Sequence, residues 1–255
     1  MEKEKSVVIF SGGLDSTTLI YYLLNEDKEV YPICFDYGQK HNIELKKAKV
    51  TCDKLGLDMK LVNLSFMKDL LGGSNALTSD DVDVPTLNDV IGEAQPITYV
   101  PNRNMMMLSI AISYAEAIGA KTVCFGAQAH DEYSGYWDTT MNFVKAINNV
   151  NKLNRENFIR VVAPFVNLSK SEEVVLGERL LEVPFEDTWT SYKVVDSENE
   201  IADSSNPTSR DRIMAFARAG LKDPQRYYPE VQWDSLIEQM EKEYNVKDIL
   251  DKIEW

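Results

Sequence analysis

The feature that most constrains this chain is a strand–turn–helix unit near its start. Residues 6–11, SVVIFS, are short, apolar and β-branched and predict a buried strand, while residues 16–27 carry apolar side chains at helical spacing. Gly12 and Gly13 lie in the turn between them, where glycine lets the backbone take torsions closed to other residues and approach a ligand closely. The free N–H groups at the start of the following helix favour an anion. The unit therefore predicts an anion-binding turn.

Strands and helices continue to alternate along the chain. Further strands are predicted at 30–38, 59–65, 121–127 and 158–164, and further helices at 41–57, 102–120, 138–153 and 169–181. About five such repeats predict an α/β fold with a doubly wound parallel sheet, which has helices on both faces. Residues 66–98 show little periodicity and are expected to form a long loop, a kind of segment that is usually functional or mobile.

The alternation stops after Thr188. Residues 191–209 are polar and read as a loop, and helical segments follow as far as Trp255. We therefore expect an α/β domain over residues 1–188 and a short, mostly helical C-terminal extension over residues 189–255.

The composition limits the partners of this chain. Its 255 residues include 27 lysines and arginines against 41 aspartates and glutamates, a formal net charge of −14, so nucleic acid is not the expected partner. Cys34, Cys52 and Cys124 form no Cys-x-x-Cys pair, which argues against a disulfide framework or a Cys-rich zinc site. Cys34 and Cys124 are expected to be buried, inert thiols. We expect a cytoplasmic protein without a signal peptide or membrane span.

The glycine turn resembles the S-G-G-x-D-S loop of the PP-loop ATP pyrophosphatases, and its residues are Ser11, Gly12, Gly13, Leu14, Asp15, Ser16 and Thr17. It has neither the lysine of a Walker A loop nor the G-x-G-x-x-G of dinucleotide-binding proteins. The resemblance implies that the loop binds the pyrophosphate end of ATP, which is cleaved between the α and β phosphates. An acidic residue beside phosphates suits a bound cation, so Asp15 is expected to help hold Mg²⁺. The alternative is a first-turn acid that favours the helix dipole.

Six further motifs narrow the resemblance. In chain order they are FDYGQKHNIEL (35–45), TYVPNRN (98–104), YSGYWD (133–138), LSKSE (168–172), DTW (187–189) and AGLKDP (219–224). Together with the glycine turn they are similar to the 7-cyano-7-deazaguanine synthase family over roughly residues 5–228.

This resemblance implies an ATP-dependent C–N ligase. In the family, ATP activates the carboxylate of 7-carboxy-7-deazaguanine as an acyl-adenylate, ammonia forms the amide, and a second ATP drives dehydration to the nitrile. A carboxylate that attacks the α-phosphorus needs cations around the phosphates, so Arg103 and Lys170 join Asp15 as candidate catalytic residues. The alternatives are a structural salt bridge for Arg103 and a solvated helix-start lysine for Lys170. Phe35 is expected beside the adenine, or else in the core.

A cluster of aromatic and polar residues is the expected binding site for the flat deazapurine, because it offers ring faces and hydrogen-bonding edges. Its members, together with the tryptophan of the DTW motif, are Glu132, Tyr133, Ser134, Gly135, Tyr136, Asp138 and Trp189. Either Glu132 or Asp138 could accept hydrogen bonds from the N–H groups of a guanine-like base. The competing interpretation is an aromatic turn without a ligand. His41 and His130 have no metal-spaced partner and are read as ordinary polar residues.

The sequence departs from the family pattern in its last part. The family carries a zinc site made of four cysteines, and those positions hold Ser191, Asp203, Asn206 and Ser209 in this chain. Hydroxyl and amide groups do not make a tetrahedral zinc site, so no zinc is expected and hydrogen bonds are expected to hold this loop instead. The family's P-D-C-R is also replaced, by residues 137–140, WDTT, where the substrate or the amine is expected to enter.

Several functions remain open at this point. The adenylate can be captured by ammonia, or by an amine on a protein, as is thought for relatives linked to antiviral defence. A third reading is a nucleotide-binding module without catalysis, which the presence of Asp15, Arg103 and Lys170 together disfavours. A tRNA-thiolating enzyme shares the loop but needs reactive cysteines and a basic surface. The family resemblance also implies a homodimer.

Overall fold

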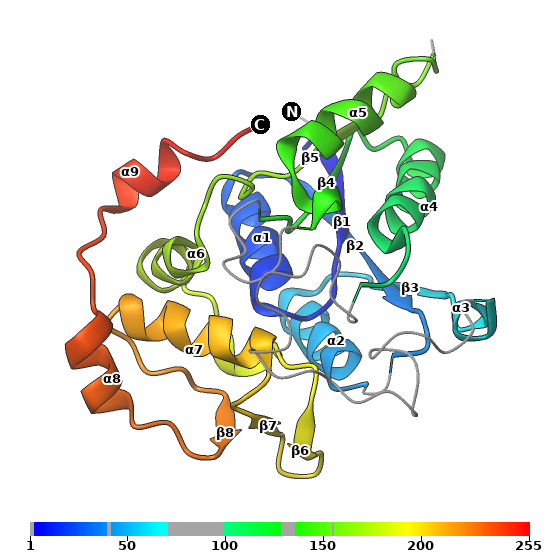
Figure 1. Ribbon diagram of the computed structural model, residues 1–255. Coiled ribbons are helices and arrows are strands. Elements are labelled where there is room, and N and C mark those ends of the chain that lie inside the picture. The colour runs from blue at the N-terminus through cyan, green and yellow to red at the C-terminus, as the bar shows by residue number, and fades with distance from the viewer. Residues whose placement is uncertain (1–2, 40–41, 71–98, 129–135, 155) are drawn as a thin grey trace.

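The computed structural model describes residues 3–39, 42–70, 99–128, 136–154 and 156–255, and these form two sheets with helices around them (Figure 1). The larger sheet has five parallel strands in the order β3-β2-β1-β4-β5. Their bounds are β1 (Lys5–Ile9), β2 (Glu29–Asp36), β3 (Lys60–Asn63), β4 (Thr122–Phe125) and β5 (Arg160–Val162). The predicted parallel α/β fold is confirmed.

The strand order reverses at β1. The chain runs from β1 outward through β2 to β3, then returns to β4 on the other side of β1 and ends at β5. In sheets of this kind the loops after the two central strands diverge, and a crevice opens at their carboxyl ends. The turn that follows β1, with Gly12 and Gly13, lies at that crevice.

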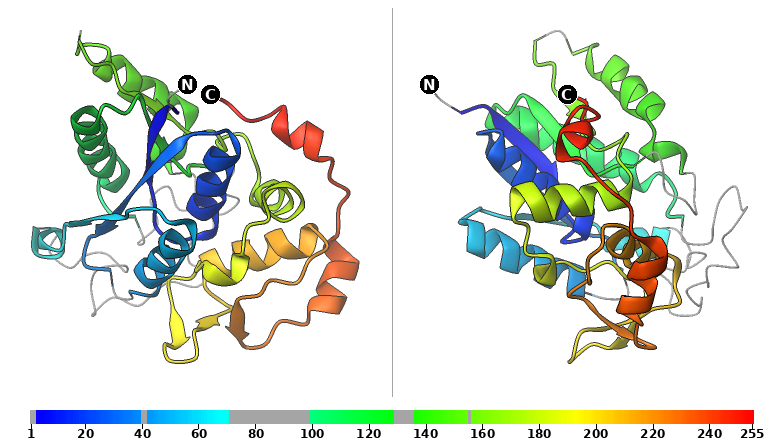
Figure 2. Two further views of the ribbon diagram at one scale, coloured as in Figure 1. Left: turned by 180° about the vertical axis from the view of Figure 1, so that it is seen from behind. Right: turned by 90° about the vertical axis from the view of Figure 1, so that its left-hand side faces the viewer.

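Helices cover both faces of the large sheet. The main ones are α1 (Leu14–Asn25), α2 (Ile43–Leu55), α4 (Arg103–Ile118), α5 (Met141–Asn151) and α6 (Lys170–Leu176), which continues as a π-helical turn at Gly177–Leu181. Figure 2 shows α4 and α5 on one side of the sheet and α1, α2 and α6 on the other. Neighbouring β1 residues therefore enter different cores: Val8 packs in the α1–α6 core and Val7 in the α4–α5 core.

The sequence predicts one long loop over residues 66–98, but Phe66–Leu70 form a short helix, α3; residues 71–98 lie outside the described residues. A five-residue helix with one buried side chain, Met67, is too short to show periodicity in the sequence.

The prediction for the cysteines is confirmed: Cys34 and Cys124 are fully buried, and burial raises the pKa of the Cys124 thiol to about 12.

The C-terminal part contains a small sheet that the sequence did not predict. Its order is β6-β7-β8, with bounds β6 (Val194–Asp196), β7 (Ile201–Asp203) and β8 (Arg226–Tyr228). Two of these strands lie within residues 191–209, so the expectation of a loop there is wrong. Three-residue strands are too short for alternation to reveal them. The helices of this part are α7 (Pro207–Arg218), α8 (Trp233–Met240) and α9 (Val246–Leu250). Two short 3₁₀ turns lie earlier in the chain, at Trp137–Thr139 and Phe185–Asp187.

Trp255 packs against α1, which covers the five-stranded sheet. Trp255 stacks on Tyr22 of α1 with ring centroids 5.8 Å apart, and its indole N–H donates to the Tyr22 hydroxyl at 2.9 Å. Among the described helices, none combines the length and apolarity that crossing a bilayer requires.

Gly12 is the position where the fold depends most on glycine. Its φ is +83°, and a Cβ there would lie 2.2 Å from the backbone oxygen of Glu44 and 2.7 Å from the backbone nitrogen of Ala48, both in α2. Because these are backbone atoms of a packed helix, they cannot turn away as a side chain could. The turn therefore packs directly on α2.

Replacement Gly12→Ala is expected to lower the free energy of unfolding by roughly 3 kcal/mol, the sum of left-handed strain of about 1 kcal/mol and the overpacking clash. Gly56→Ala is the matched control, because Gly56 also has positive φ, +66°, but nothing lies within 4 Å of its Cβ position. That control should lose only about 1 kcal/mol. Urea unfolding measures both losses, and equal losses would mean that contact with α2 does not constrain the turn.

Candidate active site

A cavity of about 330 Å³ opens at the carboxyl ends of β1, β2 and β4. Its wall combines the turn after β1, the ends of β2 and β4, the first residues of α2, α4 and α6, and residues from the C-terminal part. The lining residues used below are Ser11, Gly13, Asp15, Ser16, Phe35, Tyr37, Glu44, Arg103, Gln128, Tyr136, Lys170, Trp189, Thr190, Tyr192 and Asp211. The cavity therefore lies where doubly wound sheets bind their ligands.

The turn after β1 presents backbone N–H groups that serine hydroxyls occupy. The Ser11 N–H donates to the Ser16 hydroxyl at 3.2 Å, and the Gly13 N–H donates to the Ser11 hydroxyl at 3.2 Å. The two hydroxyls lie 3.0 Å apart. A hydroxyl can rotate away and leave such N–H groups to an anion, so the turn has the chemistry of a phosphate site.

Two other residues of the turn serve its structure. The Thr17 hydroxyl donates to the Gly13 carbonyl at 2.8 Å and is fully buried. The Leu14 side chain is fully buried in the core, so only its backbone can take part in the site.

Lys170 brings a cation to the turn. It is the first residue of α6, which begins with a capping box between Ser169 and Glu172. Its ammonium nitrogen lies 3.5 Å from Asp15 Oδ2 and 2.9 Å from Asp211 Oδ2, so two carboxylates from α1 and α7 flank it. The cation is thereby oriented at the cavity wall next to the turn.

A buried carboxyl group lies next to Asp15 and Lys170 on the side of the protein interior. Glu173 is fully buried, and Gln128 donates to its Oε1 at 2.6 Å. Burial, the nearby charge of Asp15 and a hydrogen bond to Asp15 raise the pKa of Glu173 well above its usual value. If both carboxyls were ionised, Asp15 Oδ1 and Glu173 Oε2 would each lack a hydrogen-bond donor among the described residues. A proton kept on Glu173 supplies that donor.

Arg103 brings a second cation from the start of α4. Its Nη1 donates to the Tyr37 hydroxyl at 3.4 Å, and its guanidinium lies 5.6 Å from the centre of the Tyr37 ring. Burial works against its charge, but the neighbouring tyrosines and Asp138 outweigh burial, so the pKa of Arg103 lies above its usual value. Glu44 also lines the cavity, and burial raises the pKa of its carboxyl group to about 7.

The structure brings several predicted substrate and nucleotide residues to this cavity. Phe35 lies at the end of β2 and is 5% exposed, so it is both core and cavity wall. Tyr136 also lines the cavity and stacks with Tyr99 at 6.3 Å. Trp189 lines it too, although its indole is almost fully buried and donates to the Ser191 carbonyl at 3.1 Å.

Other predicted residues are not at the cavity wall or cannot be placed. Asp138 is buried beside Arg103, and burial raises its pKa. Residues 132–135, which include Glu132, Tyr133, Ser134 and Gly135, lie outside the described residues, as do His41 and His130.

The four positions where the family is expected to hold zinc form a hydrogen-bonded cluster. The Asn206 amide donates to the Ser191 hydroxyl at 3.0 Å, to the Ser209 hydroxyl at 2.9 Å and to the Asp203 carbonyl at 2.6 Å. The two serine hydroxyls lie 2.9 Å apart. The Asp203 carboxylate instead pairs with Lys193 at 3.0 Å. The prediction that hydrogen bonds hold this loop is confirmed, and this donor set does not fit zinc.

No group of three or more His, Cys, Asp or Glu side chains that could hold a metal is present in the described part of the chain.

The sequence analysis did not identify several residues at or near the cavity: Glu44, Gln128, Glu173, Thr190, Tyr192 and Asp211. Glu44 lies inside the motif at 35–45, which could have suggested it. Thr190 and Asp211 gave no signal, because their approach to the turn depends on the tertiary fold.

Known proteins resemble this chain over most of its length. The family model "Queuosine biosynthesis protein QueC" matches residues 5–220. A 7-cyano-7-deazaguanine synthase from Caldicellulosiruptor saccharolyticus is 40% identical over 230 residues, 90% of this chain and 98% of that protein. Another from Clostridium kluyveri is 42% identical over 231 residues, 88% of this chain and 98% of that protein. The solved "4-thiouridine synthetase - RNA complex with bound ATP" aligns with a TM-score of 0.46 at 16% identity, over 98% of this chain and 52% of that one.

The raised pKa of Glu173 predicts a pH dependence of stability. The folded protein holds this proton more tightly than the unfolded chain, so the contribution of Glu173 to stability falls as pH rises from its unfolded pKa toward its folded pKa. Glu173→Gln keeps the shape without the ionisation. The free energy of unfolding of the variant, minus that of the wild type, should therefore increase as pH rises from 5 to 8, by up to about 1.4 kcal/mol per pH unit.

Urea unfolding across this pH range measures the difference. The control is Glu178→Gln, a change at an exposed position in the same stretch of chain, which should give a difference that does not depend on pH. A pH-independent difference for Glu173→Gln as well would show that the buried carboxyl does not hold its proton.

Proposed function

The chain belongs to the queuosine biosynthesis protein QueC family, and on that premise we propose that it activates the carboxylate of 7-carboxy-7-deazaguanine with ATP. The activated acid is then captured by an amine. The observation that carries this proposal is the cavity itself, where the turn after β1, Lys170 and Arg103 converge at the carboxyl ends of the central strands.

ATP is proposed to bind with its β and γ phosphates on the turn after β1. Support comes from the Ser11 and Gly13 N–H groups, which hold only rotatable hydroxyls, and from the start of α1, whose dipole favours anions. Lys170 lies beside this turn and supplies a positive charge. The adenine is proposed to lie against Phe35 at the end of β2.

Mg²⁺ is proposed to accompany the phosphates. Asp15 and Asp211 both line the cavity beside Lys170, and one or two carboxylates together with phosphate oxygens are the usual ligands of this ion. Their oxygen chemistry fits Mg²⁺, which when bound neutralises phosphate charge. Asp15 is the first candidate because it belongs to the turn.

The reaction follows from this placement. A carboxylate oxygen of the substrate attacks the α-phosphorus, the bond to the β-phosphate oxygen breaks, and pyrophosphate leaves with that electron pair. The charges of Lys170 and Arg103 offset the repulsion between the two anions. An amine then attacks the acyl carbon, AMP leaves, and the amine loses a proton. Tyr136 and Trp189, both at the cavity wall, are proposed to contact the deazapurine. Asp138, buried beside Arg103, is proposed to act through that arginine.

The acceptor amine has two candidates. Ammonia followed by a second ATP gives the nitrile, the product named for the curated relatives. A protein amine gives an amide conjugate instead. Two departures from the family pattern support this second candidate: the altered residues 137–140, where the amine is expected to enter, and the loop without cysteines. A non-catalytic nucleotide-binding module is the reading that fails if turnover is observed. We propose that the protein acts as a homodimer, as the family resemblance implies, and in the cytoplasm.

Incubation with ATP, Mg²⁺ and 7-carboxy-7-deazaguanine should release pyrophosphate, and Lys170→Gln should lower kcat by roughly 10²-fold, the usual effect of removing one group that stabilises developing charge. The control is Lys145→Gln, a change at an exposed lysine of α5, which should leave kcat unchanged. Release of ADP, or equal rates for the two variants, would contradict the proposed cleavage.

Product mass distinguishes the acceptors. With ammonium present, nitrile synthesis should give a product 18 mass units, about one water, below the amide, as follows from dehydration; conjugation should instead add the deazaguanine acyl group to a protein partner. Mass spectrometry of the reaction with and without ammonium reads both outcomes. Adenylate that only hydrolyses in both mixtures would contradict amine capture.

A further inference from the structure

We propose that the Thr190 hydroxyl is a further phosphate-binding donor, oriented for that role by a buried network around Arg212. This inference rests on the proposed function, since it assumes that the turn after β1 holds the phosphates of ATP. It adds a residue from the C-terminal part to a site that the sequence motifs place on the turn, α4 and α6.

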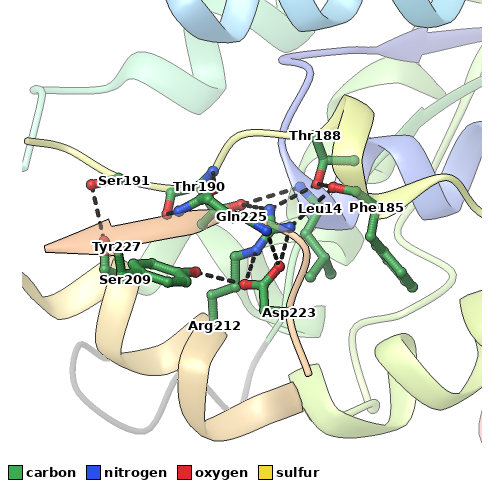
Figure 3. Close-up of polar contacts among 10 residues, drawn as sticks. All are labelled: Leu14, Phe185, Thr188, Thr190, Ser191, Ser209, Arg212, Asp223, Gln225 and Tyr227. Carbon is green, nitrogen blue, oxygen red and sulfur yellow. Dashed lines mark hydrogen bonds and ion pairs between the residues drawn. The ribbon is translucent and has the colours of Figure 1, made fainter. Parts of the chain in front are cut away.

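Residues 189 and 190 contact the turn directly. The Trp189 backbone N–H donates to the Gly12 carbonyl at 3.0 Å, and the Leu14 backbone N–H donates to the Thr190 hydroxyl at 3.3 Å. Thr190 also lines the cavity that the turn borders. Its side chain is therefore at the wall of the proposed phosphate site and bound to the first helical residue of α1 (Figure 3).

The Thr190 hydroxyl has two acceptor positions and one proton, and both acceptor positions are used. The Leu14 N–H takes one of them, and Nη1 of Arg212 takes the other at 3.4 Å. The proton must then be donated elsewhere, because a hydroxyl carries only two lone pairs. Among the described residues, none accepts it. An anionic oxygen in the cavity is the acceptor that fits.

Gln225 fixes the backbone of Thr190. Its Oε1 accepts from the Thr190 N–H at 3.0 Å, and its Nε2 donates to the Thr190 carbonyl at 3.5 Å. One amide side chain thus binds both backbone groups of the same residue, as a neighbouring strand would. Gln225 therefore holds the Thr190 backbone in place, while the Leu14 N–H and Arg212 hold its hydroxyl.

Arg212 anchors the network in the protein interior. It is fully buried and makes a bidentate pair with Asp223, at 2.7 and 2.8 Å. Its remaining donors reach the Thr188 hydroxyl at 2.7 Å and the Phe185 carbonyl at 3.1 Å, and Tyr227 donates to Asp223 at 2.6 Å. Figure 3 shows Arg212 and Asp223 at the centre of these contacts, below Thr190 in that view. A buried, fully bonded pair of this kind is rigid, because moving either partner leaves a charge unpaired.

Thr190→Val and Thr190→Ser separate the hydroxyl from the shape of the side chain. Valine keeps the branched shape without the hydroxyl, and serine keeps the hydroxyl. The probes are α,β-methylene ATP with Mg²⁺, which keeps the triphosphate but resists cleavage, and adenosine, which has no phosphate. Isothermal titration calorimetry should show Thr190→Val binding the triphosphate about three- to tenfold more weakly, the usual effect of one lost hydrogen bond. Thr190→Ser should stay within about twofold, and adenosine should bind all three proteins alike.

Trp255→Phe is the control for general destabilisation. It removes the indole hydrogen bond to the Tyr22 hydroxyl and touches neither Thr190 nor the network around Arg212, so it should lower stability while leaving triphosphate affinity unchanged. Three results would overturn the inference: Thr190→Val binding the triphosphate like the wild type, serine failing to rescue, or Trp255→Phe matching the loss in affinity. If the wild type binds the triphosphate no more tightly than adenosine, the proposed function itself is wrong. That outcome is distinct from a failure of the Thr190 inference alone, in which the wild type prefers the triphosphate and Thr190→Val does so equally.

Discussion

The packing of Gly12 between α2 and the backbone of Trp189 fixes the turn on which the cavity is built. Gly12 has positive φ, its Cα faces the backbone of α2, and its carbonyl accepts a hydrogen bond from Trp189. The turn is therefore fixed from one side by a helix of the α/β domain and from the other by the C-terminal part. This arrangement aligns the start of α1 with the cavity, and it makes the C-terminal part a component of the proposed nucleotide site.

Charge is balanced locally in a strongly acidic protein. The chain carries a formal net charge of −14, yet the cavity brings Lys170 and Arg103 to its wall. Lys170 is flanked by Asp15 and Asp211. Burial and the nearby charge of Asp15 raise the pKa of a third carboxyl group, that of Glu173, well above its usual value, which favours its neutral form. A neutral Glu173 adds no negative charge near the Lys170 ammonium, where phosphates are proposed to bind.

The sequence predicts what depends on local pattern. An apolar strand, two glycines and a helix start suffice to place the turn, and the first residues of α4 and α6, Arg103 and Lys170, follow from their motifs. The small sheet escapes such reasoning because its strands have three residues each. Thr190 escapes it because its hydroxyl contacts Leu14, 176 positions away in the sequence, and Asp211 escapes it because it pairs with Lys170 of another helix; only tertiary packing specifies such contacts. The division at residues 188 and 189 stays a prediction.

The turn after β1 is proposed to bind the tail of a triphosphate. A crystal structure of the protein with α,β-methylene ATP and Mg²⁺ tests this proposal. We expect the β and γ phosphates to lie on the backbone N–H groups of residues 11–17, with the serine hydroxyls turned aside and the Lys170 ammonium beside them. A triphosphate tail bound elsewhere, with the hydroxyls of Ser11 and Ser16 still on those N–H groups, would contradict it.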